Sequence, residues 1–362
     1  MKAKILWLAH RDPLNPKAGG AERTIFEVCT RLVKHGYDIT LVTAGWKGCS
    51  IRSSINGIKV IRLGNSITFH LLVPLFLIFN NFNVLVNDLG HAVPWPSTFI
   101  FRKNNIIFFH HLHARSLPGQ VNRLLAVIIT AIEKIYQIIY HNDIFVTESS
   151  TSVADLMHLG IDKTRIVRIP PGVDTHLFHP NKKTDFPSIV YFGGMRRYKR
   201  PEECIYILND LKVKVEKIRL NIIGTGPELP KMRKIVKELG LDTMVSFLGR
   251  LSSEELSEVV ASSWVNIHSS VTEGWGFSIL EASAAGTPTV AYSVPGVVDA
   301  IEDGINGIKV KDGDRKALTD AAIKILSSPE MWWNSSLKVG GKYSWEETAK
   351  KWDEIIKKTL EK

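Results

Sequence analysis

The chain has 362 residues, of which 44% are hydrophobic and 23% are charged, and its net charge is +10. This composition excludes a disordered or collagen-like protein, and the length predicts two globular domains, each with its own core. The three cysteines, Cys29, Cys49 and Cys204, lie far apart and form no C-x-x-C pair, so we expect a reducing, cytoplasmic compartment without a disulfide framework.

The basic excess is confined to the first half of the chain. Residues 1–180 hold 19 Lys and Arg against 11 Asp and Glu, whereas residues 181–362 hold 27 against 25. The excess serves either general solubility or an anionic partner of the first half, such as a phosphorylated acceptor or a membrane surface. Nucleic acid is not expected as a partner, because no dense Lys/Arg run with interleaved aromatics and no zinc-finger motif is present.

The first half alternates strands and helices. Apolar runs predict strands at 4–9, 38–44, 58–63, 83–88 and 105–111, and an apolar stripe predicts a helix from Ala21 to His35. A strand, a helix and a strand in this order indicate a parallel, Rossmann-like sheet. Gly19 and Gly20 lie at the helix entrance, either as a plain turn or as a place where backbone approaches a phosphate. They match neither a G-x-G-x-x-G nor a Walker A pattern.

Two apolar segments of the first half, 67–79 and 121–140, are ambiguous. The first would be about 20 Å long as a helix, too short for a bilayer core of roughly 30 Å. A buried helix is the favoured interpretation, and a surface helix that dips into a membrane is the alternative. In the second segment, Glu133 and Lys134 favour a helix packed by one face.

Three histidines, His110, His111 and His113, follow the predicted strand at 105–111. The carboxyl edge of an open α/β sheet is where ligands bind. The histidines could bind metal, pack in a loop, or donate hydrogen bonds to a sugar hydroxyl or a phosphate. No H-E-x-x-H motif or Cys/His set accompanies them, so we favour the last interpretation over a metal.

The second half repeats the same alternation after a Pro-rich connection that ends near Pro187. We therefore expect domains at residues 1–175 and 186–345, followed by an amphipathic helix at 346–362. After the strand at 188–194 comes a basic cluster, which is either a solvated helix entrance or a source of cations for a diphosphate. The cluster consists of Arg196, Arg197, Lys199 and Arg200.

The stretch at 268–296 carries two carboxylates, Glu273 and Glu281, around a glycine-rich turn. A helix is expected to begin near Phe277 or Ser278, and its N-terminus would suit an anion, above all a diphosphate. The carboxylates would then flank a hydroxyl-rich ligand, although two solvated glutamates would give the same spacing. At 311–315, D-x-D could indicate a metal-bound diphosphate, but helix capping by Asp314 is the favoured interpretation.

Taken together, these segments resemble the retaining glycosyltransferases of family 4. The E-x7-E motif in VTEGWGFSILEA carries the resemblance, and KAGGAER, HH-L-H, IPPGVDTHLF, YFGGMRRYK and AAGTPTVAYSVPGV support it. The resemblance covers nearly the whole chain. It implies the GT-B fold, with two Rossmann-like domains facing across a cleft, and a C-terminal helix that crosses back to the first domain.

The resemblance also implies roles for individual residues. Glu281 would bind the ribose of a UDP- or GDP-sugar, and Glu273 would lie near the donor sugar. Lys199 would contact the diphosphate, and Gly19 and Gly20 would let their loop close over it. Further sugar, phosphate and base contacts would come from His110, with His111 as its competitor, from Gly276, Phe277 and Ser278, and from Gly249 and Arg250.

One position departs from the family. An arginine usually follows the strand glycine, where this chain has Gly194, and we expect Arg196 or Arg197 to compensate. The implied activity is metal-independent hexosyl transfer without a cofactor, to a sugar or a lipid-linked acceptor. Alternatives are a nucleotide-sugar epimerase of the same fold and a non-catalytic nucleotide-sugar-binding protein. An NAD dehydrogenase would need a glycine fingerprint that the chain lacks.

Overall fold

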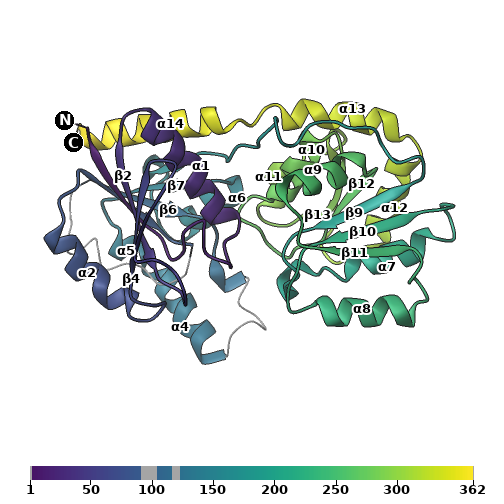
Figure 1. Cartoon of the computed structure of the whole chain (residues 1–362), viewed down its shortest axis with the longest axis horizontal. Helices are drawn as coiled ribbons and strands as arrows, with labels where there is room; N and C mark the ends of the chain where they lie inside the picture. Colours follow the sequence, from purple (N-terminus) through teal and green to yellow (C-terminus); the bar gives the residue numbers. More distant parts are fainter. Residues whose placement is uncertain (1, 91–103, 116–122, 362) are drawn as a thin grey trace. The chain divides into compact units, whose positions relative to one another are not determined.

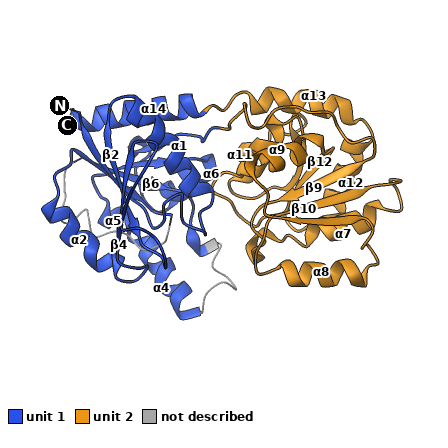
Figure 2. Ribbon diagram, viewed as in Figure 1, with its two compact units in different colours: residues 1–172, 345–362 blue, residues 173–344 orange. Residues whose placement is uncertain are grey.

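The computed structural model describes residues 2–90, 104–115 and 123–361, and it divides into two compact units (Figures 1 and 2). Unit 1 comprises Met1–Gly172 and Trp345–Lys362, and unit 2 comprises Val173–Ser344. The segment after Gly172, part of which was expected to be a linker, belongs to unit 2. The Val173 amide donates to the Tyr343 carbonyl at 3.1 Å, and Phe178 is buried in the core of unit 2.

Unit 1 is built on an eight-stranded sheet. Its strands are β1 (Lys4–Leu8), β2 (Asp38–Ala44), β3 (Arg52–Ile55), β4 (Ile58–Leu63), β5 (Val84–Asp88), β6 (Asn105–Phe109), β7 (Ile144–Thr147) and β8 (Ile166–Arg168). They are ordered β3-β4-β2-β1-β5-β6-β7-β8, and only β3 is antiparallel to its neighbour. The central strands are buried on both faces, which explains their continuous apolar sequences.

Helices cover both faces of this sheet (Figure 1). They are α1 (Gly20–Lys34), α2 (Phe69–Phe79), α4 (Arg123–Lys134), α5 (Tyr136–Ile139), α6 (Ser150–His158) and α14 (Trp345–Leu360), with short 3₁₀ turns at His113–Arg115 and Lys163–Arg165. On one face, α1 and α14 pack over β1, β2, β5 and β6. On the other face, α2 packs over β1, β2 and β5, and α4 and α5 pack over β6 and β7.

The last helix, α14, completes the core of unit 1. Trp352 lies with its ring centroid 4.9 Å from that of Trp7 and 5.2 Å from that of Phe108, and all three side chains are buried. Trp7 lies in β1 and Phe108 in β6, so the helix packs directly on two strands whose carboxyl ends carry predicted site residues. The two-domain α/β architecture and the return of the C-terminal helix to unit 1 are thereby confirmed.

Unit 2 has a six-stranded, fully parallel sheet in the order β11-β10-β9-β12-β13-β14. The strands are β9 (Ser188–Phe192), β10 (Arg219–Ile223), β11 (Val245–Gly249), β12 (Val265–His268), β13 (Thr289–Tyr292) and β14 (Gly307–Val310). The helices are α7 (Glu203–Leu211), α8 (Leu229–Glu238), α9 (Ser253–Ser262), α10 (Phe277–Ala284), α11 (Val297–Ala300), α12 (Arg315–Leu326) and α13 (Pro329–Gly340). In Figure 1, α7 and α8 lie on one side of the sheet, and α9, α10 and α13 lie on the other.

Candidate functional site

In each sheet, successive strands are added on one side of the unit's first strand and then on its other side, and the point between the two groups is the topological switch point. In unit 1 this point lies between β1 and β5, and in unit 2 it lies between β9 and β12. Loops that leave neighbouring strands in opposite directions open a crevice at their carboxyl ends, which is where ligands of open α/β sheets bind. The residues predicted for function lie at the carboxyl edges of the two sheets, after β1 and β6 in unit 1 and at or after the ends of β9, β11 and β12 in unit 2.

In unit 2, the loops after β9 and β12 meet through an ion pair. Lys199 Nζ lies 2.7 Å from Glu273 Oε1, and Ser270 Oγ donates to the same carboxylate oxygen at 2.6 Å. The two side chains are 22% and 14% exposed, so the pair is shielded but accessible. Lys199 ends the 3₁₀ turn at Arg197–Lys199, and the Val271 amide donates to the carbonyl of Tyr198, which fixes one loop on the other.

The protonation states of this pair follow from their surroundings. Burial alone would raise the pKa of Glu273, but Lys199 and His268 lower it to about 2. Burial alone would lower the pKa of Lys199, but Glu273 raises it above its ordinary value. His268 is buried, which lowers its pKa to about 4. At neutral pH the site therefore holds a carboxylate, an ammonium and a neutral imidazole.

The helix after β12 begins where the sequence predicted. Gly276 adopts φ 87° and ψ 55° as the N-cap, and α10 runs from Phe277. The left-handed conformation explains why glycine suits this position. Ser278 Oγ lies 3.0 Å from His268 Nδ1, which ties the first turn of α10 to the end of β12. The positive end of this helix therefore lies at the same sheet edge as the Lys199–Glu273 pair.

Glu273 is held in place by its backbone as well as by its side chain. Its amide donates to the Pro295 carbonyl at 3.0 Å, and a Cβ on Gly296 would lie 2.3 Å from the Glu273 carbonyl oxygen. Gly296, with φ 79°, thus permits a close approach that no other residue allows. Glu281, on the first turns of α10, is only 6% exposed.

The other cations of unit 2 differ in their roles. Arg200 is a brace, since its guanidinium donates to the carbonyls of Ser269 and Ser270 and pairs with Asp312. Arg196 and Arg197 are exposed on the turn that leads to Lys199. Gly249 ends β11 with φ 70°, followed by the exposed Arg250 at the same sheet edge.

Gly194 is not required by the backbone. A Cβ at this position would have no atom within 4 Å, and its φ lies outside the left-handed range. A side chain therefore fits without strain. The absence of the arginine expected there is a property of this sequence and not a steric demand of the loop.

In unit 1, a buried histidine lies between two carboxylates. His110 Nε2 lies 3.0 Å from Asp88 Oδ2, and His110 Nδ1 lies 3.2 Å from Glu148 Oε2. Asp88 is the last residue of β5, and His110 and Glu148 directly follow β6 and β7, neighbouring strands whose carboxyl ends coincide. Thr24 Oγ1, on α1, donates to Glu148 Oε1 at 3.0 Å, which connects this cluster to the helix that begins at Gly20.

The carboxylates determine the charge of this histidine. Burial alone would lower the pKa of His110, but Asp88 and Glu148 raise it well above its usual value. At neutral pH the ring is an imidazolium that donates from both nitrogens, and the triad of Asp88, His110 and Glu148 carries one net negative charge. In this state the ring has no N–H left for a sugar, so contact with a ligand requires one carboxylate to move.

The other predicted residues of unit 1 lie at the start of α1 and directly after His110. The Gly19 amide donates to the Glu22 carboxylate at 2.7 Å, an interaction that caps α1. His111 stacks on His113, with ring centroids 5.0 Å apart. The predicted stretch around 121–140 is described from Arg123 onward, and residues 121 and 122 lie outside the described residues.

Two family profiles match consecutive parts of the chain. The profile described as Glycosyltransferase Family 4 matches residues 18–177, and the profile described as Glycosyl transferases group 1 matches residues 173–337. The chain belongs to glycosyltransferase family 4. The boundary between the two matches coincides with the start of unit 2.

Curated relatives of the chain have diverged in sequence. It is 28% identical over 232 residues to the D-inositol 3-phosphate glycosyltransferase of Geodermatophilus obscurus, covering 59% of this chain and 52% of that protein. It is 24% identical over 352 residues to the N-acetyl-alpha-D-glucosaminyl L-malate synthase of Bacillus anthracis, covering 87% of each chain. The chain thus spans about half the length of the first relative and most of the second.

Solved structures show the fold of the chain. Sucrose-phosphate synthase from Thermosynechococcus elongatus superposes with a TM-score of 0.84 at 19% identity, covering 99% of both chains. HepE from Anabaena, in complex with UDP and glucose, superposes with a TM-score of 0.78 at 15% identity, covering 98% of this chain and 100% of that one. These likenesses confirm the GT-B fold.

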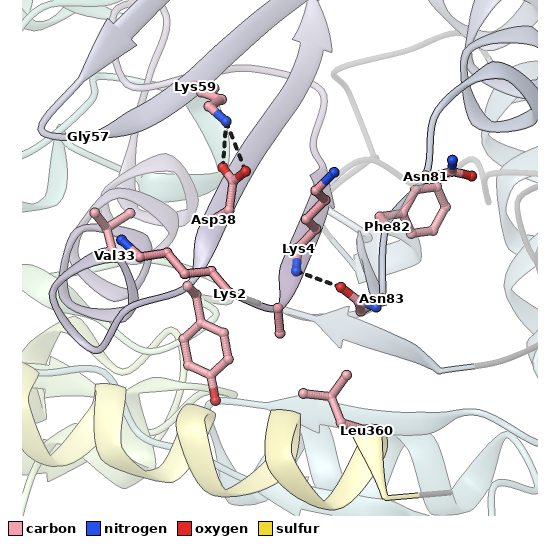
Figure 3. Close-up of a pocket in the computed structure, with 12 residues that line it drawn as sticks. Lys2, Lys4, Val33, Asp38, Gly57, Lys59, Asn81, Phe82, Asn83 and Leu360 are labelled. Carbon is pink, nitrogen blue, oxygen red and sulfur yellow. Dashed lines mark hydrogen bonds and ion pairs between the residues drawn. The ribbon is translucent and has the colours of Figure 1, made fainter.

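A pocket in the described part of unit 1 lies at another edge of the sheet. It has a volume of about 750 Å³ and is lined by the amino ends of strands, including Lys4, Asp38 and Lys59 (Figure 3). Lys59 Nζ pairs with both Asp38 oxygens at 2.7 and 2.9 Å. This edge is opposite to the carboxyl ends of the strands, so we do not assign the pocket to the candidate site.

Four residues of the two sites were not predicted. They are Asp88 and Glu148 in unit 1, and His268 and Ser270 in unit 2. Each lies at or just after the last residue of a parallel strand. Their position at the ends of strands could therefore have identified these polar residues as candidates for the sites. Which of them contact each other depends on which strands are neighbours.

Proposed function

We propose that this protein transfers a hexose from a UDP- or GDP-sugar to an acceptor hydroxyl with retention of anomeric configuration. The observation that carries the proposal is the Lys199–Glu273 pair at the β9/β12 reversal, next to the N-terminus of α10. It offers a cation and a helix dipole for a diphosphate, and a carboxylate for sugar hydroxyls. The UDP and glucose bound by the structurally similar HepE support the donor class.

The donor would displace the contact between Lys199 and Glu273. Lys199 would pair with the diphosphate, together with the N-terminus of α10 and with Arg196 or Arg197 in place of an arginine at 194. Glu273, released from Lys199, would accept hydrogen bonds from the sugar. Because its pKa is held at about 2, it stays ionised at neutral pH while Lys199 remains its partner.

The remaining donor contacts follow from position. Glu281 would accept hydrogen bonds from the ribose, and the backbone of Gly249 and Arg250 would contact the base. Gly276, Phe277 and Ser278 would hold sugar hydroxyls and phosphate. From unit 1, His110 or His111 would contact the reacting sugar, and Gly19 and Gly20 would allow the first loop to approach the phosphates.

The chemistry requires a good leaving group and a stabilised sugar cation. Breaking the bond from the anomeric carbon to the phosphate oxygen leaves the electron pair on the nucleotide diphosphate, whose charge Lys199 and the helix dipole would stabilise. In a front-face route, the acceptor oxygen attacks from the same side, and the departing phosphate oxygen takes its proton. We propose that these cations neutralise the leaving group without a metal ion or another cofactor.

The acceptor and the place of action are also part of the proposal. We propose a sugar or lipid-linked acceptor at the cytoplasmic face of a membrane. The three cysteines are free and the surface of α2 is apolar, which support this assignment. No described helix is both long and apolar enough to cross a bilayer.

The test is a donor screen on the intact protein. UDP- and GDP-sugars are incubated with lipid-phosphate or sugar acceptors, and each reaction is run with and without EDTA. We expect acceptor-dependent release of UDP or GDP that EDTA leaves unchanged. Loss of transfer in EDTA would contradict the metal-free assignment, and conversion of the donor without any acceptor would indicate an epimerase. Tight donor binding without turnover would indicate a non-catalytic binding protein. This alternative is relevant because the chain has Gly194 where the family usually has an arginine.

A further inference from the structure

One face of unit 1 exposes an unusual amount of apolar surface. In the described part of the chain, twenty large apolar side chains are exposed, and twelve of them lie on α2, α4 and α5 or directly beside them. Exposed fractions reach 73% for Leu71, 82% for Phe79 and 71% for Leu124. Soluble monomers rarely gather so many apolar side chains on one face, which marks an interaction surface.

The two longer helices share this face of the sheet. The inward side chains of α2, Phe69, Val73 and Leu77, pack on Leu6 and Leu85. Those of α4 and α5 pack on Ile107 and Phe109, which point to the same side of the sheet as Leu85 because β5 and β6 are parallel and in register. Figure 1 shows α2, α4 and α5 together along one side of unit 1, opposite α1 and α14.

The outward-facing apolar side chains of α2 and α4 are exposed and do not pack within unit 1. The eleven residues of α2 contain no charged side chain, so the helix is apolar on its outer face as well as on its inner face. At about 1.5 Å per residue it is roughly 16 Å long, about half of the hydrocarbon thickness of a bilayer. A short helix of this kind lies along an interface and does not span it.

The sequence segment that carries this face is basic, although its Arg62 is buried against Asp12 and its Lys59 pairs with Asp38. Between Gly45 and Asn142 the sequence holds nine Lys and Arg but only two acidic residues, Asp88 and Glu133. Both acidic side chains are buried: Asp88 contacts His110, and Glu133 accepts from the His113 amide at 2.6 Å. The rest of the chain is nearly balanced, with 37 basic and 34 acidic residues. The basic excess of the protein thus belongs mainly to the segment that carries the apolar face.

We propose that the outer surface of α2 and α4 is a docking surface for an anionic lipid membrane. Leu71, Leu75 and Phe79 on α2 and Leu124 and Ile128 on α4 would enter the boundary between headgroups and acyl chains. Arg123 and Lys134, at the two ends of α4, would contact anionic headgroups. Apolar burial combined with electrostatic attraction is what holds interfacial helices on anionic bilayers. A protein partner with the same apolar complementarity would need carboxylates matched to these cations, whereas a lipid surface supplies negative charge everywhere.

The experiment is vesicle sedimentation with the full chain and no nucleotide or sugar present. We expect binding to phosphatidylcholine vesicles that contain about 30% phosphatidylglycerol, weaker binding at high salt, and little binding to phosphatidylcholine alone. Replacing both cations in the pair R123Q/K134Q should lower partitioning about 25-fold, since one cation near an anionic surface contributes about fivefold. The pair L71S/L124S should abolish sedimentation.

Matched controls lie in unit 2. They are one apolar and one basic position outside the apolar face: Val213 is 78% exposed, and Lys234 is 77% exposed. V213S and K234Q should bind vesicles as the wild type does, and thermal unfolding should confirm that all variants fold. The proposal is overturned if the wild type does not sediment, if L71S/L124S sediments unchanged, or if the controls lose binding equally. It is also overturned if the wild type forms a dimer that L71S/L124S loses, because the face then covers a second copy.

This result and the proposed glycosyl transfer are separable. Sedimentation is measured without substrate, so a protein that binds vesicles but transfers no sugar contradicts only the catalytic proposal. A protein that transfers sugar to a soluble acceptor but ignores vesicles contradicts only the docking surface.

Discussion

The two candidate sites use buried charge in opposite ways. In unit 2, Lys199 balances Glu273, and the N-terminus of α10 together with Arg196 and Arg197 adds positive potential. In unit 1, one imidazolium lies between two carboxylates, so Asp88 and Glu148 leave the cluster negative. The first arrangement suits a diphosphate. The second suits hydroxyl groups and a sugar that develops positive charge. The predictions below test whether this division of charge is functional.

The largest effect is expected for Lys199→Ala. Removing this shielded cation, which pairs with Glu273, should lower kcat/KM about 10²- to 10³-fold, the usual cost of losing a preorganised group that stabilises developing negative charge. Steady-state kinetics with the preferred donor measures it. Lys234→Ala, at an exposed position of α8, serves as the control and should be unchanged. Near-normal activity in the Lys199 variant would contradict the proposal that the unit 2 site stabilises the negative charge of a diphosphate.

Glu281→Ala should have the next largest effect. A charge-assisted hydrogen bond to the ribose contributes about 1.5–3 kcal/mol, so donor affinity should fall roughly 10- to 100-fold. Isothermal titration with UDP or GDP measures the loss directly. A nucleoside diphosphate that lacks the ribose hydroxyls should bind equally weakly to this variant and to the wild type. Unchanged nucleotide affinity would exclude the ribose role of Glu281.

Asp88→Asn tests the charge of the triad in unit 1. The folded-state pKa of His110 is raised above its unfolded value, so its stabilising contribution is complete below about pH 6.5 and is lost as the pH rises through the folded pKa. Removing one carboxylate lowers the folded pKa, so the loss should move to lower pH. Thermal unfolding between pH 6 and 9 and the NMR titration of the His110 ring measure this shift, and kcat should fall about tenfold.

The control for that variant is Asp320→Asn, on the exposed side of α12. It should leave both the pH profile and kcat as in the wild type. If Asp88→Asn shifts the stability profile without any change in kcat, the unit 1 triad is structural and the proposed contact of His110 with the sugar fails.

The smallest effect is expected for Gly194→Arg. Because a Cβ at this position meets no atom within 4 Å, the variant should fold normally and add a cation where the family usually has one. One further charge-assisted contact to a diphosphate should lower the donor KM about three- to tenfold. Gly194→Ala separates charge from backbone effects and should resemble the wild type. An unchanged KM in the arginine variant would indicate that Arg196 or Arg197 already fills this role.

Local rules predicted much of this structure. The start of α10 at Phe277, the capping of α12 by Asp314 and the bounds of α14 follow from glycine, cap and periodicity signals within a few residues. The short strands β3, β8 and β14 were not predicted, because three or four residues on a sheet edge or next to a loop give little periodicity.

Long-range pairing limited the prediction of the sites. Lys199 and Glu273 were both identified, but their contact joins residues 74 positions apart and depends on β9 and β12 being neighbours. Asp88 and Glu148 were missed for the same reason. Each is an ordinary residue at a strand end until β5, β6 and β7 align and bring both to His110.

The place of α14 has a consequence for how the protein is made. Unit 2 is one uninterrupted segment, whereas unit 1 is assembled from both ends of the chain and lacks Trp352 against Trp7 and Phe108 until α14 has been synthesised. Domains generally fold in the order in which they emerge from the ribosome, but here the later segment is the one that can finish first. Until α14 has been made, Trp7 and Phe108 therefore lack the aromatic side chain that packs against them.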